Sequence, residues 1–212
     1  MVTHSKFKFV AGSLCLDFVN TVGGWLRSGR EPDYADRILA EKFTAFPDLL
    51  DWAQLAGVLT LAEARRFASN DGRTLLPRAI ALRQSLYRVL KSLQHGWAPP
   101  NTDLLRLNRE ISAAQSHRRL MGAASASERR QDRLARPLVR TWDNCHIPDR
   151  ILWTVAESGA ELLTSAEIAS VRQCPGGDCG WMFLDTSRNH ARRWCQMRIC
   201  GNRAKVRRFR QE

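Results

Sequence analysis

Two cysteine-bounded stretches decide how the C-terminal part of this chain can fold: Cys174-Pro-Gly-Gly-Asp-Cys179 and Cys195-Gln-Met-Arg-Ile-Cys200. Each has four residues between its cysteines, and fifteen residues separate the two stretches. A spacing of two to four residues lets the backbone turn tightly enough to bring both thiolates to one tetrahedral ion. The two glycines of the first stretch favour such a turn because glycine tolerates positive φ.

Four thiolates at this spacing favour Zn²⁺ and leave no coordination position for a substrate water, so we expect one structural zinc ion. The expected ligands are Cys174, Cys179, Cys195 and Cys200. Zinc binding of about 10–16 kcal/mol would stabilise a module that has little core of its own. An iron–sulfur cluster, disulfide pairing and replacement of one cysteine by His190 are the alternatives. We expect Cys15 and Cys145 to be small buried apolar groups.

Positive charge is concentrated around the same cysteines. The chain has 212 residues and a formal net charge of +12. Residues 172–212 contain ten basic and three acidic side chains, and Arg118–Arg140 contains seven basic and two acidic ones. A localised basic excess is typical of proteins that bind polyanions. The alternative is a basic tail that serves only solubility.

The basic C-terminal segment predicts a nucleic-acid surface on two short helices. Asp185-Thr186-Ser187 can cap the first, and Asn202 can cap the second, in which Val206 and Phe209 should turn inward. Arginine and asparagine read base edges, and arginine and lysine neutralise phosphates. The expected contacts are Arg188, Asn189, Arg192, Arg193, Arg198, Arg203, Lys205, Arg207, Arg208 and Arg210. The alternative is plain solvation or a local carbonyl contact, and for Asn202 and Arg203 a role in bracing the second knuckle.

The first 170 residues predict a mainly helical domain, followed by a zinc module over residues 171–212. Pro47 suits a first helical turn, Gly57 suits a C′ position, and Thr60 with Glu63 is typical of a capping box. The expected elements are a strand-like run at 7–10, a buried helix over 14–22, a loop over 24–46, helices near 47–56, 60–70, 74–95, 101–115 and 149–163, a loose β-hairpin over 117–143 with a flexible tip, a capping box at 164–167 that begins a short last helix, and a strand with Trp181, Phe183 and Leu184.

The C-terminal residues resemble the CGNR zinc-finger family, named after the tetrapeptide that is Cys200-Gly-Asn-Arg203 in this chain. The similarity extends from Val171 to Arg210. Members usually carry an N-terminal helical domain called ABATE, which is associated with stress-induced transcription regulation. The stretches Gly12–Thr21 and Leu152–Leu163 are similar to that domain. The resemblance implies zinc on the four cysteines and a DNA-binding role.

A two-part layout predicts that the first domain senses a small-molecule effector or a partner while the zinc module binds DNA. Asp17 and Asn20 are polar residues inside an apolar run, and such groups must find partners or ligands. They are the candidates for an effector pocket. The alternative is that both brace neighbouring backbone groups.

Several function classes lack support in the sequence. Nucleophile-elbow, zinc-protease, Walker A and dinucleotide-binding patterns are all missing, so we expect no enzyme and no catalytic residue. No apolar run approaches the roughly 20 residues of a membrane helix, and the N-terminus lacks a signal-peptide core, so we expect a cytoplasmic protein without membrane contact. A zinc-stapled protein–protein module and an RNA-binding module remain alternatives, and the sequence does not decide whether a homodimer forms.

Overall fold

The computed structural model describes residues 5–26, 37–70, 72–122, 138–143 and 146–210. The α-helices are α1 (Leu14–Val19), α2 (Phe46–Leu55), α3 (Leu61–Phe67), α4 (Leu75–Gln94), α5 (Asn101–His117), α6 (Arg150–Thr164) and α7 (Asn202–Phe209). The strands form three antiparallel pairs, β1 (Trp25–Leu26) with β2 (Arg37–Ile38), β3 (Arg118–Gly122) with β4 (Leu138–Trp142), and β5 (Val171–Gln173) with β6 (Met182–Leu184). A 3₁₀ turn η1 (Ala166–Ser170) and a π-helical turn η2 (Met197–Gly201) complete the described elements. The predicted mainly helical class is confirmed.

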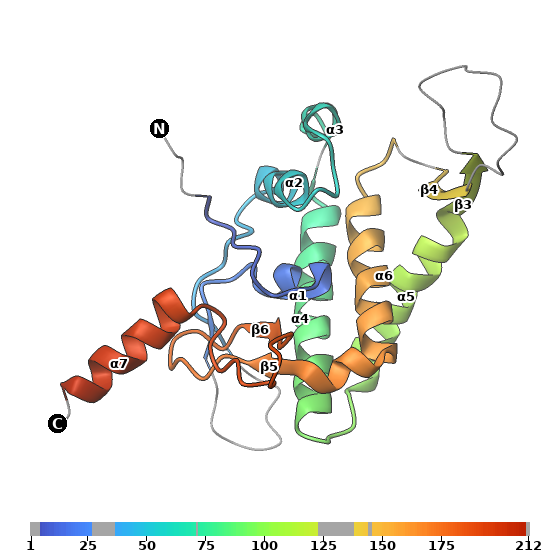
Figure 1. Ribbon diagram of the computed structural model, residues 1–212. Coiled ribbons are helices and arrows are strands. Elements are labelled where there is room, and N and C mark those ends of the chain that lie inside the picture. The colour runs from blue at the N-terminus through green and yellow to red at the C-terminus, as the bar shows by residue number, and fades with distance from the viewer. Residues whose placement is uncertain (1–4, 27–36, 71, 123–137, 144–145, 211–212) are drawn as a thin grey trace, which may run out of the picture.

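The core is built around α1, which lies against α4 and α6 and also contacts β6. Helices α4, α5 and α6 run side by side, α2 and α3 lie at one end of them, and the C-terminal segment lies beside their other half (Figure 1). Phe18 of α1 is fully buried and meets Trp52 of α2 edge-on, with ring centroids 4.9 Å apart. The predicted burial of Cys15 is confirmed, and Cys145 lies outside the described residues.

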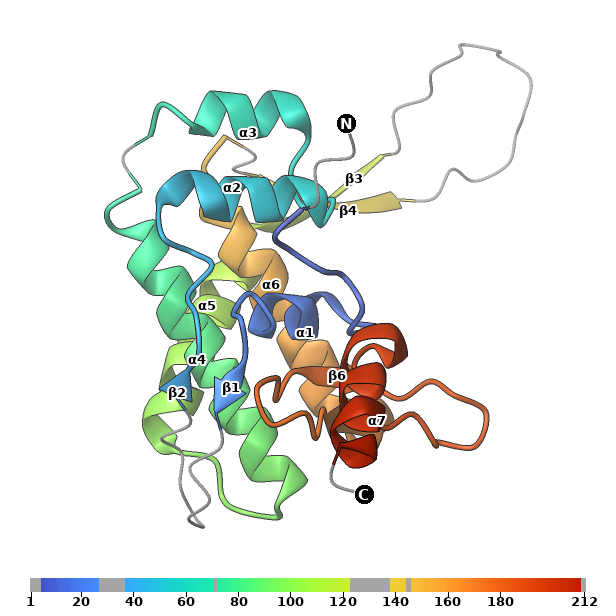
Figure 2. The same ribbon diagram turned by 90° about the vertical axis from the view of Figure 1, so that its left-hand side faces the viewer.

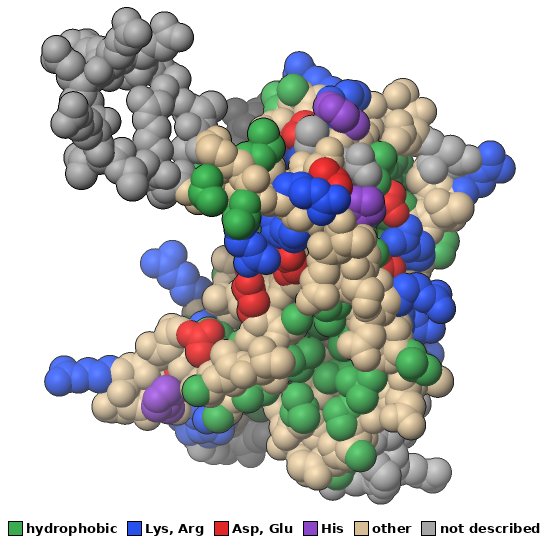
Figure 3. All heavy atoms as spheres, turned by 90° about the vertical axis from the view of Figure 1, so that its right-hand side faces the viewer, with side chains coloured by type: hydrophobic (Ala, Val, Ile, Leu, Met, Phe, Trp, Pro, Cys, Tyr) green, Lys and Arg blue, Asp and Glu red, His purple; other side chains and the backbone are tan. Residues whose placement is uncertain are grey.

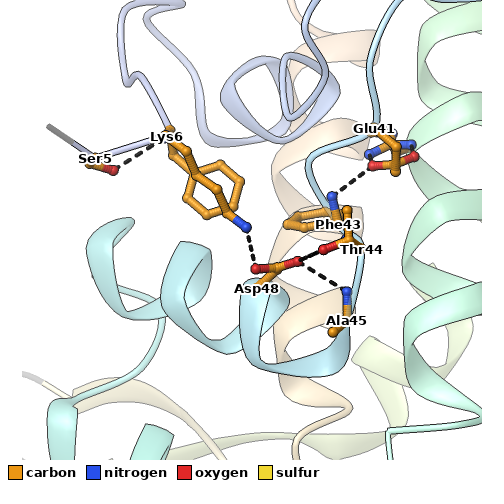
Figure 4. A network of polar contacts seen from close by, with 9 residues as sticks. Ser5, Lys6, Glu41, Phe43, Thr44, Ala45 and Asp48 are labelled. Carbon is orange, nitrogen blue, oxygen red and sulfur yellow. Dashed lines mark hydrogen bonds and ion pairs between the residues drawn. The ribbon is translucent and has the colours of Figure 1, made fainter.

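The carboxylate of Asp48, in the first turn of helix α2, accepts several hydrogen bonds. Asp48 Oδ2 accepts hydrogen bonds from the N–H groups of Thr44 (2.8 Å) and Ala45 (3.0 Å) and from the Thr44 hydroxyl (2.7 Å), as Figure 4 shows. Lys6 pairs with the other oxygen of the same carboxylate. Partial burial raises the pKa of Asp48, but these hydrogen bonds and Lys6 outweigh it and lower the pKa to about 2. The helix start near Pro47 was predicted.

One predicted capping box is confirmed and the other is displaced. Thr60 donates its N–H to Glu63 (2.8 Å), and its hydroxyl accepts the Glu63 N–H (3.3 Å), as the pattern predicts. Thr164, expected to open the last helix, is instead the final residue of α6. Ser165 caps η1 by accepting the N–H of Glu167 (3.2 Å).

The N-terminal stretches differ from their predicted structure. The run at 7–10 is not a strand, because Phe7 packs on Phe43 (5.7 Å between centroids) while the following backbone bonds to a side chain of α1. The predicted loop over 24–46 contains the short pair β1–β2 in its described part. The buried Arg83 of α4 fixes the chain between α1 and β1, since it donates to Thr21 O (3.1 Å) and to Oε1 of the half-buried Glu41 (2.7 Å).

The predicted β-hairpin is present as β3–β4, in register from Arg118 opposite Trp142 to Gly122 opposite Leu138. The expected flexible tip lies outside the described residues. The guanidinium carbon of Arg118 lies 3.5 Å from the Trp142 ring centroid, and Arg118 also pairs with Glu157 of α6. These contacts hold the base of the hairpin to the bundle. The strands expose Leu120, Met121, Leu138 and Val139, and Figure 3 shows hydrophobic side chains on this face of the molecule.

None of the helices in the described part of the chain combines the length and apolar character that a bilayer-spanning helix needs.

Candidate metal centre and nucleic-acid interface

The four predicted ligands meet at one point. The ligand atoms of Cys174, Cys179, Cys195 and Cys200 all lie within 4.8 Å of one another, and all four residues are buried. The Cys179–Cys195 Sγ separation is 3.5 Å, and the Cys195–Cys200 separation is 3.6 Å. Tetrahedral Zn–S bonds of ~2.3 Å require sulfurs about 3.8 Å apart, whereas a disulfide requires ~2 Å. An iron–sulfur cluster is several atoms wide and would hold its thiolates farther apart, so the geometry fits a single zinc ion.

The electrostatics of the thiols also call for a cation. Hydrogen bonds from Cys179 and Cys195 lower the pKa of Cys174, and the bond to Cys174 raises the pKa of Cys179. Four negative charges at these distances repel, so the thiols alone favour one thiolate and share the remaining protons. A divalent ion reverses this preference and stabilises all four thiolates. His190 is not a member of the cluster, because its Nδ1 lies 3.2 Å from Asp185 O.

Backbone hydrogen bonds shape both knuckles. Strands β5 and β6 run antiparallel, and the Cys174 N–H continues their ladder by donating to Trp181 O (2.8 Å). The Cys179 N–H donates to Gly176 O (3.0 Å) and closes the tight turn of the first knuckle. The second knuckle is the turn η2, which places Cys200 near its end. The pairing of β5 with β6 confirms the predicted strand at Phe183 and Leu184, and Trp181 lies just before it.

Two family models match the chain, one over its C-terminal part and one over the part before it. The model of the CGNR zinc finger matches residues 170–212, which contain the whole metal site. The model of ABATE, described as a putative stress-induced transcription regulator, matches residues 12–166, well over half of the chain. The chain belongs to the ABATE family. No curated protein matches it. The matches confirm the resemblance, and with the four-cysteine cluster they identify a structural zinc site.

The ABATE segment and the CGNR module share one hydrophobic core. Asn20, at the end of α1, pairs with the backbone of Met182 through two hydrogen bonds: its Nδ2 donates to Met182 O (2.7 Å), and its Oδ1 accepts the Met182 N–H (3.0 Å). The Trp25 N–H donates to Cys179 O (2.8 Å). The module therefore lies against α1 and β1 (Figure 2), and the predicted boundary after residue 170 falls inside a continuous core.

Two glycines make the contact between β1 and the first knuckle sterically possible. A Cβ at Gly24 would lie 2.4 Å from Asp178 O, and a Cβ at Gly180 would lie 2.4 Å from Trp25 O. Gly180 also has a φ of +58°, which side chains rarely adopt. Any larger residue at either position would push the knuckle away from β1.

Asp17 and Asn20 have backbone partners, which favours the bracing alternative over an effector pocket. Asp17 Oδ1 accepts the N–H groups of Val10 (2.9 Å) and Ala11 (3.0 Å). Burial raises the pKa of Asp17, although these two hydrogen bonds oppose that effect. Both polar atoms of Asn20 are satisfied by Met182, and Asn20 is only 2% exposed. Asp17 therefore braces the N-terminal stretch and Asn20 braces β6, as the alternative interpretation predicts.

Arg192, one of the predicted nucleic-acid contacts, is bonded within the protein. Its Nη2 donates to Val10 O (2.9 Å) and Cys195 O (2.6 Å), and its guanidinium carbon lies 4.5 Å from the Phe183 ring centroid. With further bonds from Nε to Trp194 O (3.2 Å) and from Nη1 to Leu184 O (3.3 Å), four of the five N–H groups of the guanidinium are engaged, which leaves little capacity for a phosphate. Arg192 instead joins the second knuckle to the N-terminal stretch of the chain.

The first of the predicted basic helices does not form. Asp185, expected to cap it, accepts the N–H (3.0 Å) and hydroxyl (2.6 Å) of Ser187 at Oδ1 and the Arg192 N–H (3.1 Å) at Oδ2. His190 has a φ of +47°, outside the helical region. The segment is therefore a loop closed around one carboxylate. The exposed predicted contacts on this loop are Arg188, Asn189 and Arg193.

Most of the remaining predicted contacts lie in and before α7, which extends away from the body of the molecule (Figure 1). The exposed basic residues of this part are Arg198, Arg203, Lys205, Arg207, Arg208 and Arg210. Asp178 of the first knuckle pairs with Arg207 (2.7 Å) and lies 3.8 Å from Arg203, so these two arginines tie α7 to the knuckle. Asn202 Nδ2 donates to Arg198 O (3.1 Å), which confirms a bracing contact for Asn202.

The apolar residues of α7 do not turn inward as predicted. Val206 is 51% exposed and Phe209 is 82% exposed. The side of α7 that faces the first knuckle carries Ala204 and Arg207 instead. Because Asp178 binds Arg207, that side of the helix is turned toward the knuckle, and Val206 and Phe209 point elsewhere.

Lys42, to which no sequence pattern pointed, lies over Trp181 in the zinc module. Its Nζ is 4.7 Å from the Trp181 ring centroid. Burial, together with repulsion from Lys8, lowers the pKa of Lys42 to about 8. No local pattern points to this residue, because the groups around it come from distant parts of the sequence.

Proposed function

We propose that this protein is a DNA-binding transcription regulator in which the CGNR module contacts duplex DNA and the ABATE segment responds to an effector or partner. One observation carries the proposal: a fixed, exposed cationic surface extends from the second knuckle along α7. Residues 197–210 contain six basic side chains and no acidic one. Lysine and arginine displayed in this way bind a phosphate backbone by displacing its counterions.

The placement of these charges argues against a tail that serves only solubility. A solubilising tail needs no defined position, whereas α7 is held to the first knuckle by Asp178 and follows directly from a zinc ligand. Arg193 and its neighbours on the 185–194 loop add further exposed cations to the same module. The contact with the first knuckle gives the charges of α7 a defined position, and phosphate contacts of this kind fix the register of a protein on duplex DNA.

We propose a binding role rather than catalysis, because four thiolates complete the tetrahedral coordination of zinc and leave no position for a substrate. We also propose that the protein acts in the cytoplasm, with access to the chromosome. An effector bound to the ABATE segment would affect the CGNR module through the core that they share, since Asn20 and Trp25 form hydrogen bonds with the module.

The test is the salt dependence of binding of the full-length, zinc-loaded protein to short labelled DNA duplexes, measured by fluorescence anisotropy from about 50 to 200 mM salt. We expect Arg208→Ala to weaken binding and to reduce the slope of log K against log salt by about 0.9, the value for one phosphate contact. Arg109→Ala is the matched control, because Arg109 is an exposed arginine on α5, far from the module in sequence.

Three outcomes would contradict the proposal. Equal slopes for Arg208→Ala and the wild type would remove α7 from the interface. Tighter binding to single-stranded or hairpin RNA than to duplex DNA would favour an RNA-binding module. Absence of binding to either nucleic acid would favour a protein–protein module.

A further inference from the structure

The exposed side of α7 carries an apolar ridge that the zinc site and the charge pattern do not explain. We define this ridge as Ile199, Val206 and Phe209, which are 41%, 51% and 82% exposed. Apolar side chains exposed together to this degree in a small module usually mark a binding surface. The core to which the module is attached leaves these side chains uncovered, so we expect a binding partner to cover them.

The three residues share one face. Val206 and Phe209 are three residues apart on α7 and so project from one side of that helix, while Ile199 lies in the preceding π-helical turn η2. Ile199 and Val206 border one shallow hollow of the surface, and Val206 and Phe209 border the next. Arg207, bound to Asp178, also borders the hollow of Ile199 and Val206, so the ridge lies beside the contact with the first knuckle and is exposed there.

The charges around the ridge indicate which class of partner binds it. Arg198, Lys205 and Arg210 border the same two hollows, and the segment 197–210 contains no acidic residue. A second copy of this chain would place these cations against their own kind, which repels. A polyanion that also presents apolar groups satisfies both features. Duplex DNA is such a partner, because the C5-methyl of thymine projects into the major groove.

We propose that α7 enters the major groove with the Ile199–Val206–Phe209 ridge against the base edges, where it reads thymine methyl groups while the flanking cations contact phosphates. The inference rests on the proposed DNA-binding function and narrows it to sites that contain A·T pairs at the ridge. The major groove is about 12 Å wide and admits one helix, and apolar contact with the thymine methyl is an established form of base readout. Burial of one methyl group corresponds to about a fourfold change in affinity.

The test compares three duplexes of equal length: alternating A·T, the same duplex with deoxyuridine in place of thymidine, and alternating G·C. Deoxyuridine lacks only the C5-methyl group, so it preserves base pairing and charge. We expect the wild-type protein to bind the thymidine duplex at least roughly fourfold more tightly than the deoxyuridine duplex. Val206→Ser and Phe209→Ala should reduce that ratio toward one. Leu105→Ser, at a 68% exposed position on α5, should leave it unchanged.

Each result has a distinct meaning. Equal affinity of the wild type for the thymidine and deoxyuridine duplexes overturns the ridge as a methyl reader, although DNA binding itself would stand. Absence of binding to all three duplexes by folded, zinc-loaded protein refutes the proposed function. Binding to phosphatidylglycerol vesicles that Phe209→Ala abolishes, without discrimination between duplexes, assigns the ridge to a membrane surface and overturns the inference. A dimer that Phe209→Ala dissociates would overturn it in favour of self-association.

Discussion

Replacement of Asn20 by alanine should strongly destabilise the protein, because one amide side chain completes the hydrogen bonding of β6. Asn20 holds both the N–H and the C=O of Met182, at 3.0 and 2.7 Å. Asn20 and Met182 are both buried, so water cannot replace the lost partners. A buried polar group left unsatisfied costs about 1–3 kcal/mol. Two such groups predict a loss of roughly 2–6 kcal/mol, a large part of the 5–15 kcal/mol stability of a typical domain.

The assay is guanidinium denaturation of zinc-loaded protein followed by circular dichroism and tryptophan fluorescence. Asn108→Ala is the matched control, because Asn108 is exposed on α5 and its replacement should change stability by less than about 0.5 kcal/mol. Zinc retention measured in the same samples should fall for Asn20→Ala, since β6 precedes the second knuckle. A loss below about 1 kcal/mol would refute the bracing role. It would restore Asn20 as a candidate for effector binding.

Three further predictions concern the zinc module and the cap of α2. Arg192→Ala should lower stability by about 1.5–3 kcal/mol, because it removes the charged hydrogen bonds of Arg192. Arg193→Ala should leave the denaturation midpoint unchanged but flatten the salt dependence of DNA binding. Equal denaturation curves for the two variants would contradict the structural role of Arg192. Cys195→Ser removes a zinc ligand and should lower the thermal midpoint of the helical dichroism signal, because the module covers α1. An unchanged midpoint would show that the first 170 residues fold independently. Asp48 has a lowered pKa of about 2, so it contributes stability above its unfolded pKa of about 4, and that contribution disappears as the pH falls through 2. The stability difference between wild type and Asp48→Ala, measured by urea denaturation, should therefore shrink between about pH 4 and pH 2, and a constant difference would argue against the cap.

The zinc ligands and most helices could be predicted because their signals are local. Ligand spacing within each knuckle fixes which thiolates can share an ion, and that part needed no knowledge of the remaining fold. The capping box at Thr60 and Glu63 likewise depends on residues three apart, and both of its hydrogen bonds are present. These features survive in any tertiary context.

The errors arose where remote groups decide the outcome. Asp185 looked like a helix cap, but it closes a loop because Arg192 is anchored to Val10, at the other end of the chain. Val206 and Phe209 followed an amphipathic pattern, yet the orientation of α7 depends on the ion pair between Arg207 and Asp178. The periodicity of apolar residues shows which side of a helix is apolar, but not whether that side packs against the rest of the protein.

The bonds between Asn20 and Met182 also govern when this protein can fold during its synthesis. The two residues are separated by 162 positions, so α1 leaves the ribosome long before the strand that completes its packing. Metal capture comes later still, because the last ligand is Cys200. Closure of the core therefore awaits synthesis as far as Cys200, and long-range contacts of this kind slow folding. An incomplete nascent chain would expose the apolar side of α1, which makes early termination products natural targets for chaperones and proteases.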